Sequence, residues 1–117
     1  MMIQSKAALA LTFLVAVIVA ALTLAPISVP APVENSDKIY HILAFAALAF
    51  PISLFRPDWL IFSIPVFAVF GGAIEIIQPY VGRECNLSDW IADLVGIAIG
   101  VSFGRAAAAV IPSPPSP

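Results

Sequence analysis

The chain has 117 residues, enough for one domain, and 62% of them are hydrophobic while only 10% are charged. A soluble domain of this size could not cover so much apolar surface, so a mean hydropathy of +1.06 excludes an ordinary soluble fold and predicts a protein of the lipid bilayer. The formal net charge is −2 and no basic run is present, so we expect no binding of nucleic acid.

Four charge-poor stretches are long enough to cross a bilayer. They cover about residues 7–25, 39–55, 59–80 and 89–110. We therefore expect an all-α membrane protein whose four transmembrane helices form an antiparallel bundle, with both termini on the same side. This domain would take up residues 1–111, and the proline- and serine-rich residues 112–117 are predicted to be disordered.

The first stretch is uncharged from Ala7 to Ala25. Its apolar run is longer than the core of about 7–15 residues that is typical of a signal peptide, so we interpret it as a retained helix. Three prolines punctuate residues 26–37, and the next helix is expected to begin near Asn35 to Asp37, where cap-forming residues precede the apolar run.

The third stretch runs from Trp59 to Tyr80, with aromatic residues at both ends as interfacial belts predict. Pro65 could kink it, and Gln78-Pro79 marks its exit. After a polar loop, Asn86 or Ser88 is well placed to cap the fourth helix.

Four spans bring one group of polar residues to the same leaflet, because the second and fourth helices begin there and the third ends there. This polar group comprises Asp37, Lys38, His41, Glu75, Gln78, Arg83, Glu84, Asp89 and Asp93. The terminal side carries Lys6, Arg56 and Arg105, against Lys38 and Arg83 on the other side, which favours cytoplasmic termini and an outer polar group.

Glu75 is the sharpest feature of this group. It precedes Tyr80 by five residues, so a helical rise of about 1.5 Å per residue places it inside the membrane boundary, where a carboxylate usually faces the bundle interior. Gly71, Glu75 and Gln78 share one helix face, and the glycine would let a helix or a ligand approach the carboxylate. A structural pair between helices is the alternative to a functional role.

His41 follows Asp37 by four residues, so both can lie on one face with Lys38. It could be a general base, a hydrogen-bond donor to an anionic head group or a metal ligand, although a lone histidine is usually structural. One histidine with carboxylates is a weak metal signature, and Cys85 has no second cysteine in the chain, so we expect neither a metal nor another cofactor.

Three further polar residues have two interpretations each. Arg83 could grip a phosphate or pair with a carboxylate. Asp89 could bind a ligand or merely favour the dipole of the helix that it begins. Asp93 lies a full turn deeper and is harder to explain in that way.

Small residues recur along the fourth stretch at Gly96, Gly100 and Gly104, on the same stripe as the two aspartates. This small-xxx-small pattern permits close helix packing. We expect it to dock the fourth helix inside the protein and to aim Asp89 and Asp93 inward, in preference to forming a dimer interface.

Taken together, these motifs resemble the VanZ-like family of small bacterial membrane proteins. The resemblance covers about residues 37–104 and rests on D37-K38-x-x-H41, E75-x-x-Q78, G82-R83, S88-D89 and G96-x-x-x-G100. It implies a multi-pass protein of the bacterial cytoplasmic membrane, with Asp37, Lys38, His41, Glu75, Gln78, Arg83 and Asp89 at the characteristic polar positions. The family usually has asparagine where this chain has Asp93, and an extra acid there would make the group more negative or would have to be protonated.

Three functions fit these observations. The polar group could bind the head group of an envelope lipid or of a lipid-linked precursor, with Arg83 and Lys38 meeting phosphate. It could instead be the active site of an enzyme that acts on such a lipid, with Glu75 or His41 as acid–base. Finally, it could be a structural network that fixes helix packing, in a homo-oligomer or beside a larger envelope protein. A proton pathway is disfavoured, because only Arg56 and Asp58 could continue it on the far side.

Overall fold

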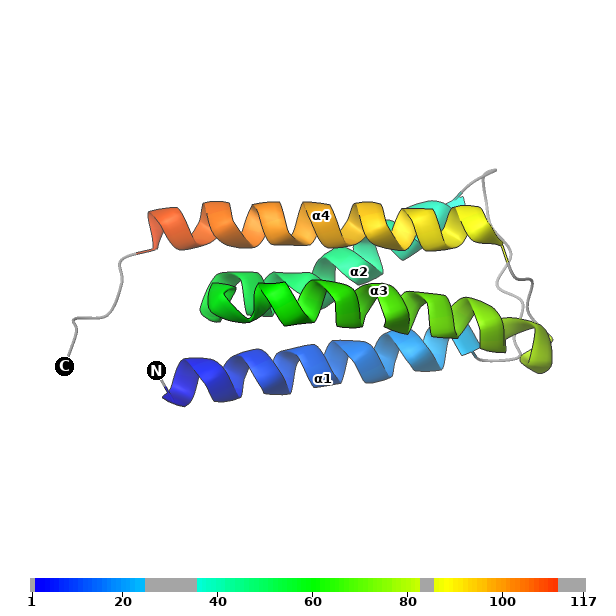
Figure 1. Cartoon of the computed structure of the whole chain (residues 1–117), viewed down its shortest axis with the longest axis horizontal. Coiled ribbons are helices and arrows are strands. Elements are labelled where there is room, and N and C mark those ends of the chain that lie inside the picture. The colour runs from blue at the N-terminus through cyan, green and yellow to red at the C-terminus, as the bar shows by residue number, and fades with distance from the viewer. Residues whose placement is uncertain (1, 25–35, 83–85, 112–117) are drawn as a thin grey trace.

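Every regular element is helical in the part of the chain described by this computed structural model, residues 2–24, 36–82 and 86–111. The four α-helices are α1 (Met2–Leu24), α2 (Ser36–Phe55), α3 (Leu60–Ile77) and α4 (Leu87–Val110), and the 3-10 helices η1 (Pro57–Trp59) and η2 (Gln78–Val81) flank α3. Consecutive helices run antiparallel, so α1 begins and α4 ends at the same end of the bundle (Figure 1). The predicted all-α class is confirmed.

Four helical segments are long and apolar enough to cross a membrane, as the sequence predicts: Ile3–Leu24, Lys38–Phe55, Pro57–Val81 and Leu87–Val110. The first helix begins earlier than predicted, at Met2 and not after Lys6. Lysine is a good helix former and this one is exposed, so its charge does not end the helix.

The third span comprises η1, α3 and η2. Trp59 belongs to η1, and the α-helix ends at Ile77, directly before the exit that the sequence predicts at Gln78-Pro79. Pro79 explains the change at the far end, because it lacks the N–H group for an α-helical hydrogen bond and its ring would clash with the carbonyl group four residues earlier. The chain then leaves η2 through Gly82, whose φ of 81° lies in the left-handed region that glycine adopts readily.

The start of α4 is capped as predicted. Asn86 is the N-cap residue, and its side-chain oxygen accepts a hydrogen bond from the backbone N–H of Ser88 at 3.0 Å. Trp90, one turn later, donates its indole N–H to the carbonyl oxygen of Ala68 at 3.0 Å and so ties α4 to α3.

Helices α2 and α4 make the most extensive contact in the bundle. Gly96 and Gly100 of α4 lie directly against the carbonyl oxygens of Ile42 and Ala46 of α2, and a Cβ atom at either glycine would collide with them. Gly104 faces Ser53, whose hydroxyl donates a hydrogen bond to the carbonyl of α4 residue 101 at 2.7 Å. The glycine stripe therefore docks α4 inside the protein, as the sequence predicts.

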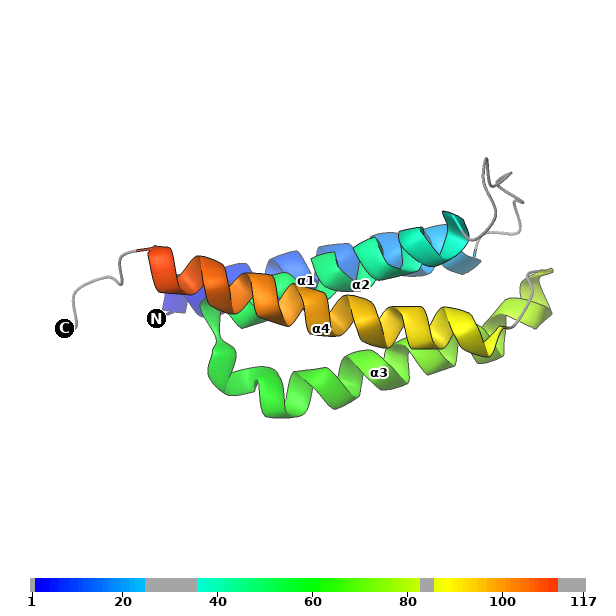
Figure 2. The same cartoon turned by 90° about the horizontal axis from the view of Figure 1, so that it is seen from above.

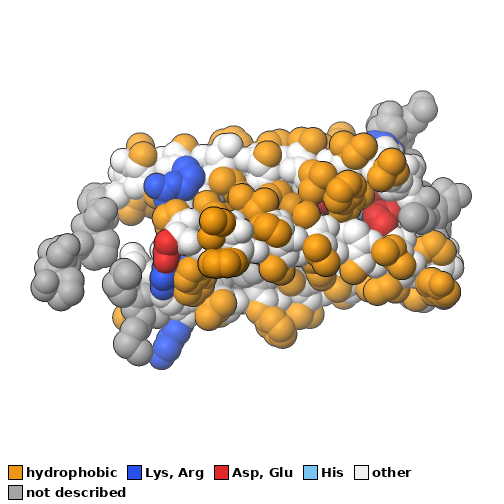
Figure 3. All heavy atoms as spheres, in the orientation of Figure 1, with side chains coloured by type: hydrophobic (Ala, Val, Ile, Leu, Met, Phe, Trp, Pro, Cys, Tyr) orange, Lys and Arg blue, Asp and Glu red, His pale blue; other side chains and the backbone are white. Residues whose placement is uncertain are grey.

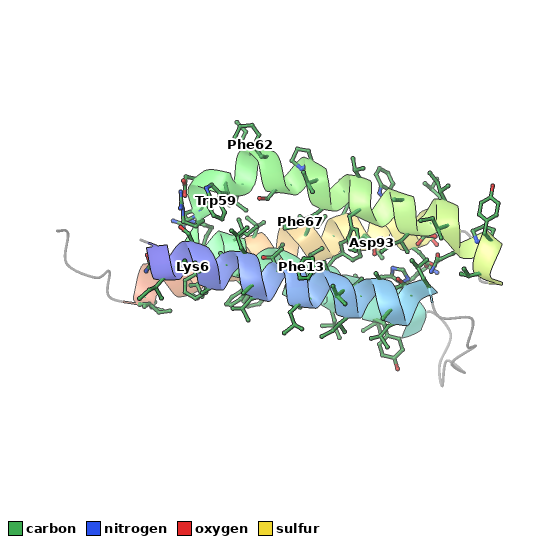
Figure 4. All side chains as sticks on the ribbon, turned by 90° about the horizontal axis from the view of Figure 1, so that it is seen from below. Lys6, Phe13, Trp59, Phe62, Phe67 and Asp93 are labelled. Carbon is green, nitrogen blue, oxygen red and sulfur yellow. The ribbon has the colours of Figure 1, made fainter. Side chains whose placement is uncertain are left out.

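The interior is filled by side chains of all four helices, and Phe45 and Leu48 of α2 are the largest fully buried apolar ones. The outer surface is also apolar. Phe13 and Phe62 point away from the bundle and are 72% and 74% exposed, whereas Phe67 points inward (Figure 4). Figure 2 shows the helices alone from the opposite side. On the face seen in Figure 3, the charged side chains lie only near the two ends of the bundle.

The glycine stripe generates a first prediction. Gly100→Ala should lower the free energy of unfolding by about 1–3 kcal/mol, because the added methyl group must push α2 away at Ala46. The matched control is Gly72→Ala, where the nearest atom to the new Cβ would be the indole nitrogen of Trp90 at an ordinary 3.5 Å. Thermal unfolding in detergent, followed by circular dichroism, measures both. Equal stability of the two variants would contradict the close α2–α4 contact.

Candidate functional site

A group of buried polar side chains lies at the end of the bundle where α2 and α4 begin and α3 ends. We call it the polar cluster, and it consists of His41 of α2, Glu75 of α3, Gln78 of η2, and Asp89 and Asp93 of α4. Four elements supply it, and Asp93 projects into the space between the helices (Figure 4). Burying so many polar groups in an apolar bundle is costly unless they pair with one another or with a ligand.

The innermost contact of the cluster joins α2 to α4. His41 and Asp93 lie 2.7 Å apart, measured from Nδ1 to Oδ1, and Asp93 is completely buried. An ionised carboxylate can only accept, so Nδ1 of the imidazole donates. This bond fixes the orientation of the ring and leaves Nε2 facing the rest of the cluster.

Asp89 lies one turn nearer the helix end than Asp93. Its Oδ2 atom is 3.8 Å from His41 Nε2, and its Oδ1 atom is 3.7 Å from Lys38 Nζ. The first distance is too long for a hydrogen bond. Lys38 is partly exposed, so it forms the solvent-facing edge of the cluster.

Glu75 is 5% exposed, and only one of its two carboxylate oxygens accepts a hydrogen bond from the described residues. The backbone N–H of Asn86 donates to Oε2 at 3.1 Å, whereas Oε1 is buried and has no hydrogen-bond partner among the described residues. The same asparagine that caps α4 thus positions the carboxylate of α3. An unsatisfied buried oxygen of this kind marks a place where another group can bind.

Gln78 connects the cluster to α1. It is 2% exposed, and its side-chain amide donates to the carbonyl oxygen of Thr23 at 3.1 Å. Its own Oε1 atom is buried and has no hydrogen-bond partner within the described ranges. Gln78 and Glu75 therefore each present one free acceptor oxygen in the interior.

Gly71 creates the space for Asp93. A Cβ atom at this position would lie 2.8 Å from Asp93 Oδ2 and 3.3 Å from the ring of Phe45. The sequence predicts that Gly71 lets another group approach the face that carries Glu75. In the structure, the group that approaches is the carboxylate of Asp93 from α4.

The structure brings together six of the residues that the sequence places in the polar group: Lys38, His41, Glu75, Gln78, Asp89 and Asp93. Arg83 and Glu84 lie outside the described residues, as does the side chain of Asp37. Sequence reasoning missed two backbone partners, the N–H of Asn86 and the carbonyl of Thr23. The polarity of Asn86 is a local signal, but an apolar helix such as α1 carries none for its carbonyl groups.

A cavity of about 550 Å³ adjoins the polar cluster. It lies between α1 and α2, and its walls are apolar side chains such as Val15, Val19 and Ala44. His41 and Thr23 line its polar end. Leu22 and Leu43 also line it and are largely exposed, so the cavity opens onto the outer surface of the bundle. His41 thus belongs to both the cavity wall and the cluster.

The cluster also contains one set of residues with the chemistry of metal ligands. His41, Glu75 and Asp89 each offer a donor atom, and the three donor atoms lie within 4.8 Å of one another. The sequence predicts no metal, because one histidine with carboxylates is a weak metal signature. It places these residues at the same leaflet, but it does not determine how far apart their donor atoms lie.

Asp93 supplies a second prediction. Asp93→Ala should lower the free energy of unfolding by about 3–5 kcal/mol, because it leaves the buried His41 without its partner. Asp93→Asn should cost clearly less, since the amide oxygen can still accept from Nδ1. Chemical unfolding in detergent measures both variants. Asp58→Asn, at the exposed Arg56–Asp58 pair, is the control and should change little. Equal losses for the alanine and asparagine variants would contradict the assigned hydrogen bond.

Comparisons with protein-family models, with curated proteins and with solved structures find no match to this chain. The resemblance to VanZ-like proteins therefore rests on the sequence motifs alone. One departure from that pattern has a simple physical reading here. Asp93 accepts a hydrogen bond from His41, and asparagine, the usual family residue, could accept the same bond.

Proposed function

We propose that this chain is a VanZ-like, multi-pass protein of the bacterial cell envelope that binds an envelope lipid or a lipid-linked precursor by its head group. One observation carries this proposal. An apolar cavity open to the outer surface leads directly to a buried polar cluster, with His41 common to both. This combination suits an amphipathic ligand whose chain lies in the cavity and whose head group meets the cluster.

Three features support insertion in a membrane. Four segments have the length and hydropathy of transmembrane helices, and the outward-facing side chains are largely apolar. In addition, the described backbone is almost entirely helical, so its polar groups are satisfied within each segment, as a hydrocarbon environment requires.

The charge distribution supports one orientation. Lys6, Arg56 and Arg105 belong to the end of the bundle where α1 begins and α4 ends, which we assign to the cytoplasm by the excess of basic residues. The polar cluster then faces the outer leaflet of the cytoplasmic membrane. A head group at this depth would reach His41 and Lys38 from the interface.

The dimensions of the cavity match part of one hydrocarbon chain. Its α1 wall extends from Val15 to Thr23, which corresponds to about 12 Å of helix. Lys38, which lies 3.7 Å from Asp89 of the cluster, would meet a phosphate. Arg83, which follows Gly82 in the sequence, is proposed to do the same. Glu75, Asp89 and Asp93 oppose a simple anion site, so the head group carries sugar hydroxyls or binds with a cation.

A second candidate function is catalysis on the same lipid. It is favoured by the orientation of His41, whose Nδ1 is held by Asp93 while Nε2 faces the cluster, as in a general base positioned by a carboxylate. Glu75 would then be the second acid–base group. Glu75→Gln should retain lipid and block turnover if this candidate is correct.

The lipid proposal is tested by filling the cavity. Ala44→Phe places a ring among the cavity-lining side chains, and we expect it to lose the bound lipid because the ring takes the volume of the hydrocarbon chain. Ala98→Phe adds the same ring at an exposed position of α4 and is the matched control. Native mass spectrometry of protein purified from its own membrane measures the lipid and gives its mass.

Arg83→Ala tests the polar end in the same experiment. We expect a lipid of one defined mass on the wild type and on Ala98→Phe, and its loss from folded Ala44→Phe and Arg83→Ala. If all four proteins carry the same mixture of bulk lipids, the proposed function is wrong and the cluster is a structural network. Circular dichroism verifies that each variant is helical.

A further inference from the structure

We infer that the polar cluster is a binding site for a divalent transition-metal ion, held by Nε2 of His41 and by one carboxylate oxygen each from Glu75 and Asp89. These donors come from α2, α3 and α4, all three residues are buried, and their ligand atoms lie within 4.8 Å of one another. The inference departs from the sequence prediction of no metal. The reason is geometric, because three separate helices converge on the same point.

The histidine is oriented as metal-binding histidines are. Such a residue usually donates its other ring N–H to a carboxylate, which fixes the tautomer and points the free nitrogen at the ion. Asp93 has this role for His41, with 2.7 Å between Oδ1 and Nδ1. Gly71 supports the arrangement, because any side chain there would displace Asp93.

The spacing of the donors fits an ion better than a hydrogen bond. His41 Nε2 and Asp89 Oδ2 are 3.8 Å apart, which is beyond hydrogen-bonding distance. Two atoms that each lie about 2.1 Å from a shared zinc ion are separated by about 3–4 Å. The full set spans slightly more than this, so closure around an ion requires a small side-chain shift toward the centre.

Glu75 adds an independent observation. Glu75 is only 5% exposed. Its Oε2 atom accepts a hydrogen bond from the backbone N–H of Asn86, whereas Oε1 has no hydrogen-bond partner among the described residues. A carboxylate oxygen that is buried and unpartnered is stabilised strongly by a nearby cation. The hydrogen bond from the backbone N–H of Asn86 to Oε2 would hold the Glu75 carboxylate in place, as outer partners do in metal sites.

The charge of the cluster points the same way. Glu75, Asp89 and Asp93 are three carboxyl groups within one small buried volume, next to a histidine and one partly exposed lysine. Like charges at such distances cannot all remain ionised without compensation. A divalent ion supplies that compensation and allows all three to remain carboxylates.

The donor set selects the class of ion. Imidazole with two carboxylates suits Zn²⁺ and related transition-metal ions better than Mg²⁺, which prefers oxygen ligands and retains several waters. Three protein ligands leave a coordination position open. We assign this position to a phosphate oxygen of the head group, and this part of the inference rests on the proposed function. It explains how an acidic cluster can receive a phosphate.

Metal binding is tested on detergent-purified protein that carries no polyhistidine tag and has been stripped with a chelator. A calorimetric titration with Zn²⁺ should show one equivalent bound per chain. In a separate thermal unfolding experiment, Zn²⁺ should raise the melting temperature of the protein. Co²⁺ should give visible absorption bands typical of nitrogen and oxygen ligands. Mg²⁺ should bind much more weakly than Zn²⁺.

The variants distinguish ligands from neighbours. Glu75→Gln and Asp89→Asn keep the size of each side chain and should abolish both Zn²⁺ uptake and the Co²⁺ bands. Asp93→Asn, which changes only the partner of His41, should weaken binding about 10–100-fold. Asp58→Asn, at the opposite end of the bundle, should bind as the wild type does.

Two results would overturn the metal site. One is a folded wild type that takes up neither Zn²⁺ nor Co²⁺, which would leave shared protons as the compensation for the carboxylates. The other is unchanged uptake by Glu75→Gln and Asp89→Asn, which would place the ion elsewhere.

Lipid content, measured on the same metal-free samples, separates this failure from that of the proposed function. A defined lipid that stays on protein without metal would overturn the inference and leave the proposed function standing. Stoichiometric Zn²⁺ that is lost in the ligand variants, on a protein without a defined lipid, would support the metal site and overturn the proposed function.

Discussion

The close approach of α4 to α2 is the contact on which the polar cluster depends. Gly96 lies against the carbonyl of Ile42, which neighbours His41, and Asp93 is one turn before Gly96 on the same face. Any side chain at Gly96 would separate the two backbones. A separation of even one ångström would carry the His41–Asp93 contact, now 2.7 Å, beyond the range of a hydrogen bond.

Hydrogen bonds within the protein explain how the chain tolerates buried polar groups. In an apolar bundle, each polar group must find a partner inside the protein or remain close to water. Asp93 finds His41, Oε2 of Glu75 finds the Asn86 amide, and the Gln78 amide finds the carbonyl of Thr23. These bonds leave Oε1 of Glu75 and Oε1 of Gln78 without a hydrogen-bond partner among the described residues, and both atoms belong to the cluster.

The position of α1 connects the cluster to the apolar outer surface of the bundle. Helix α1 contacts α2 and, through Thr23, the side chain of Gln78, but it leaves a cavity beside His41. A ligand that reaches the cluster through this opening must therefore pass between apolar walls. The geometry suits the proposed lipid-binding function and the alternative enzymatic function equally, because both would require a polar site beside an apolar cavity.

Local properties of the sequence determined much of this protein. Hydropathy predicted the four helices, and the small-residue spacing predicted the buried face of α4 with its two aspartates. The capping role of Asn86 and the break at Gln78-Pro79 also follow from neighbouring residues alone.

Only the tertiary structure decided which polar groups meet. His41 and Asp93 are 52 residues apart in the chain, and their contact depends on the rotation and crossing of α2 and α4. The convergence of Glu75 with His41 and Asp89 and the cavity beside α1 depend on the same variables. Periodicity identifies the face of a helix but not the partner that the face meets, because that choice is made by packing between helices.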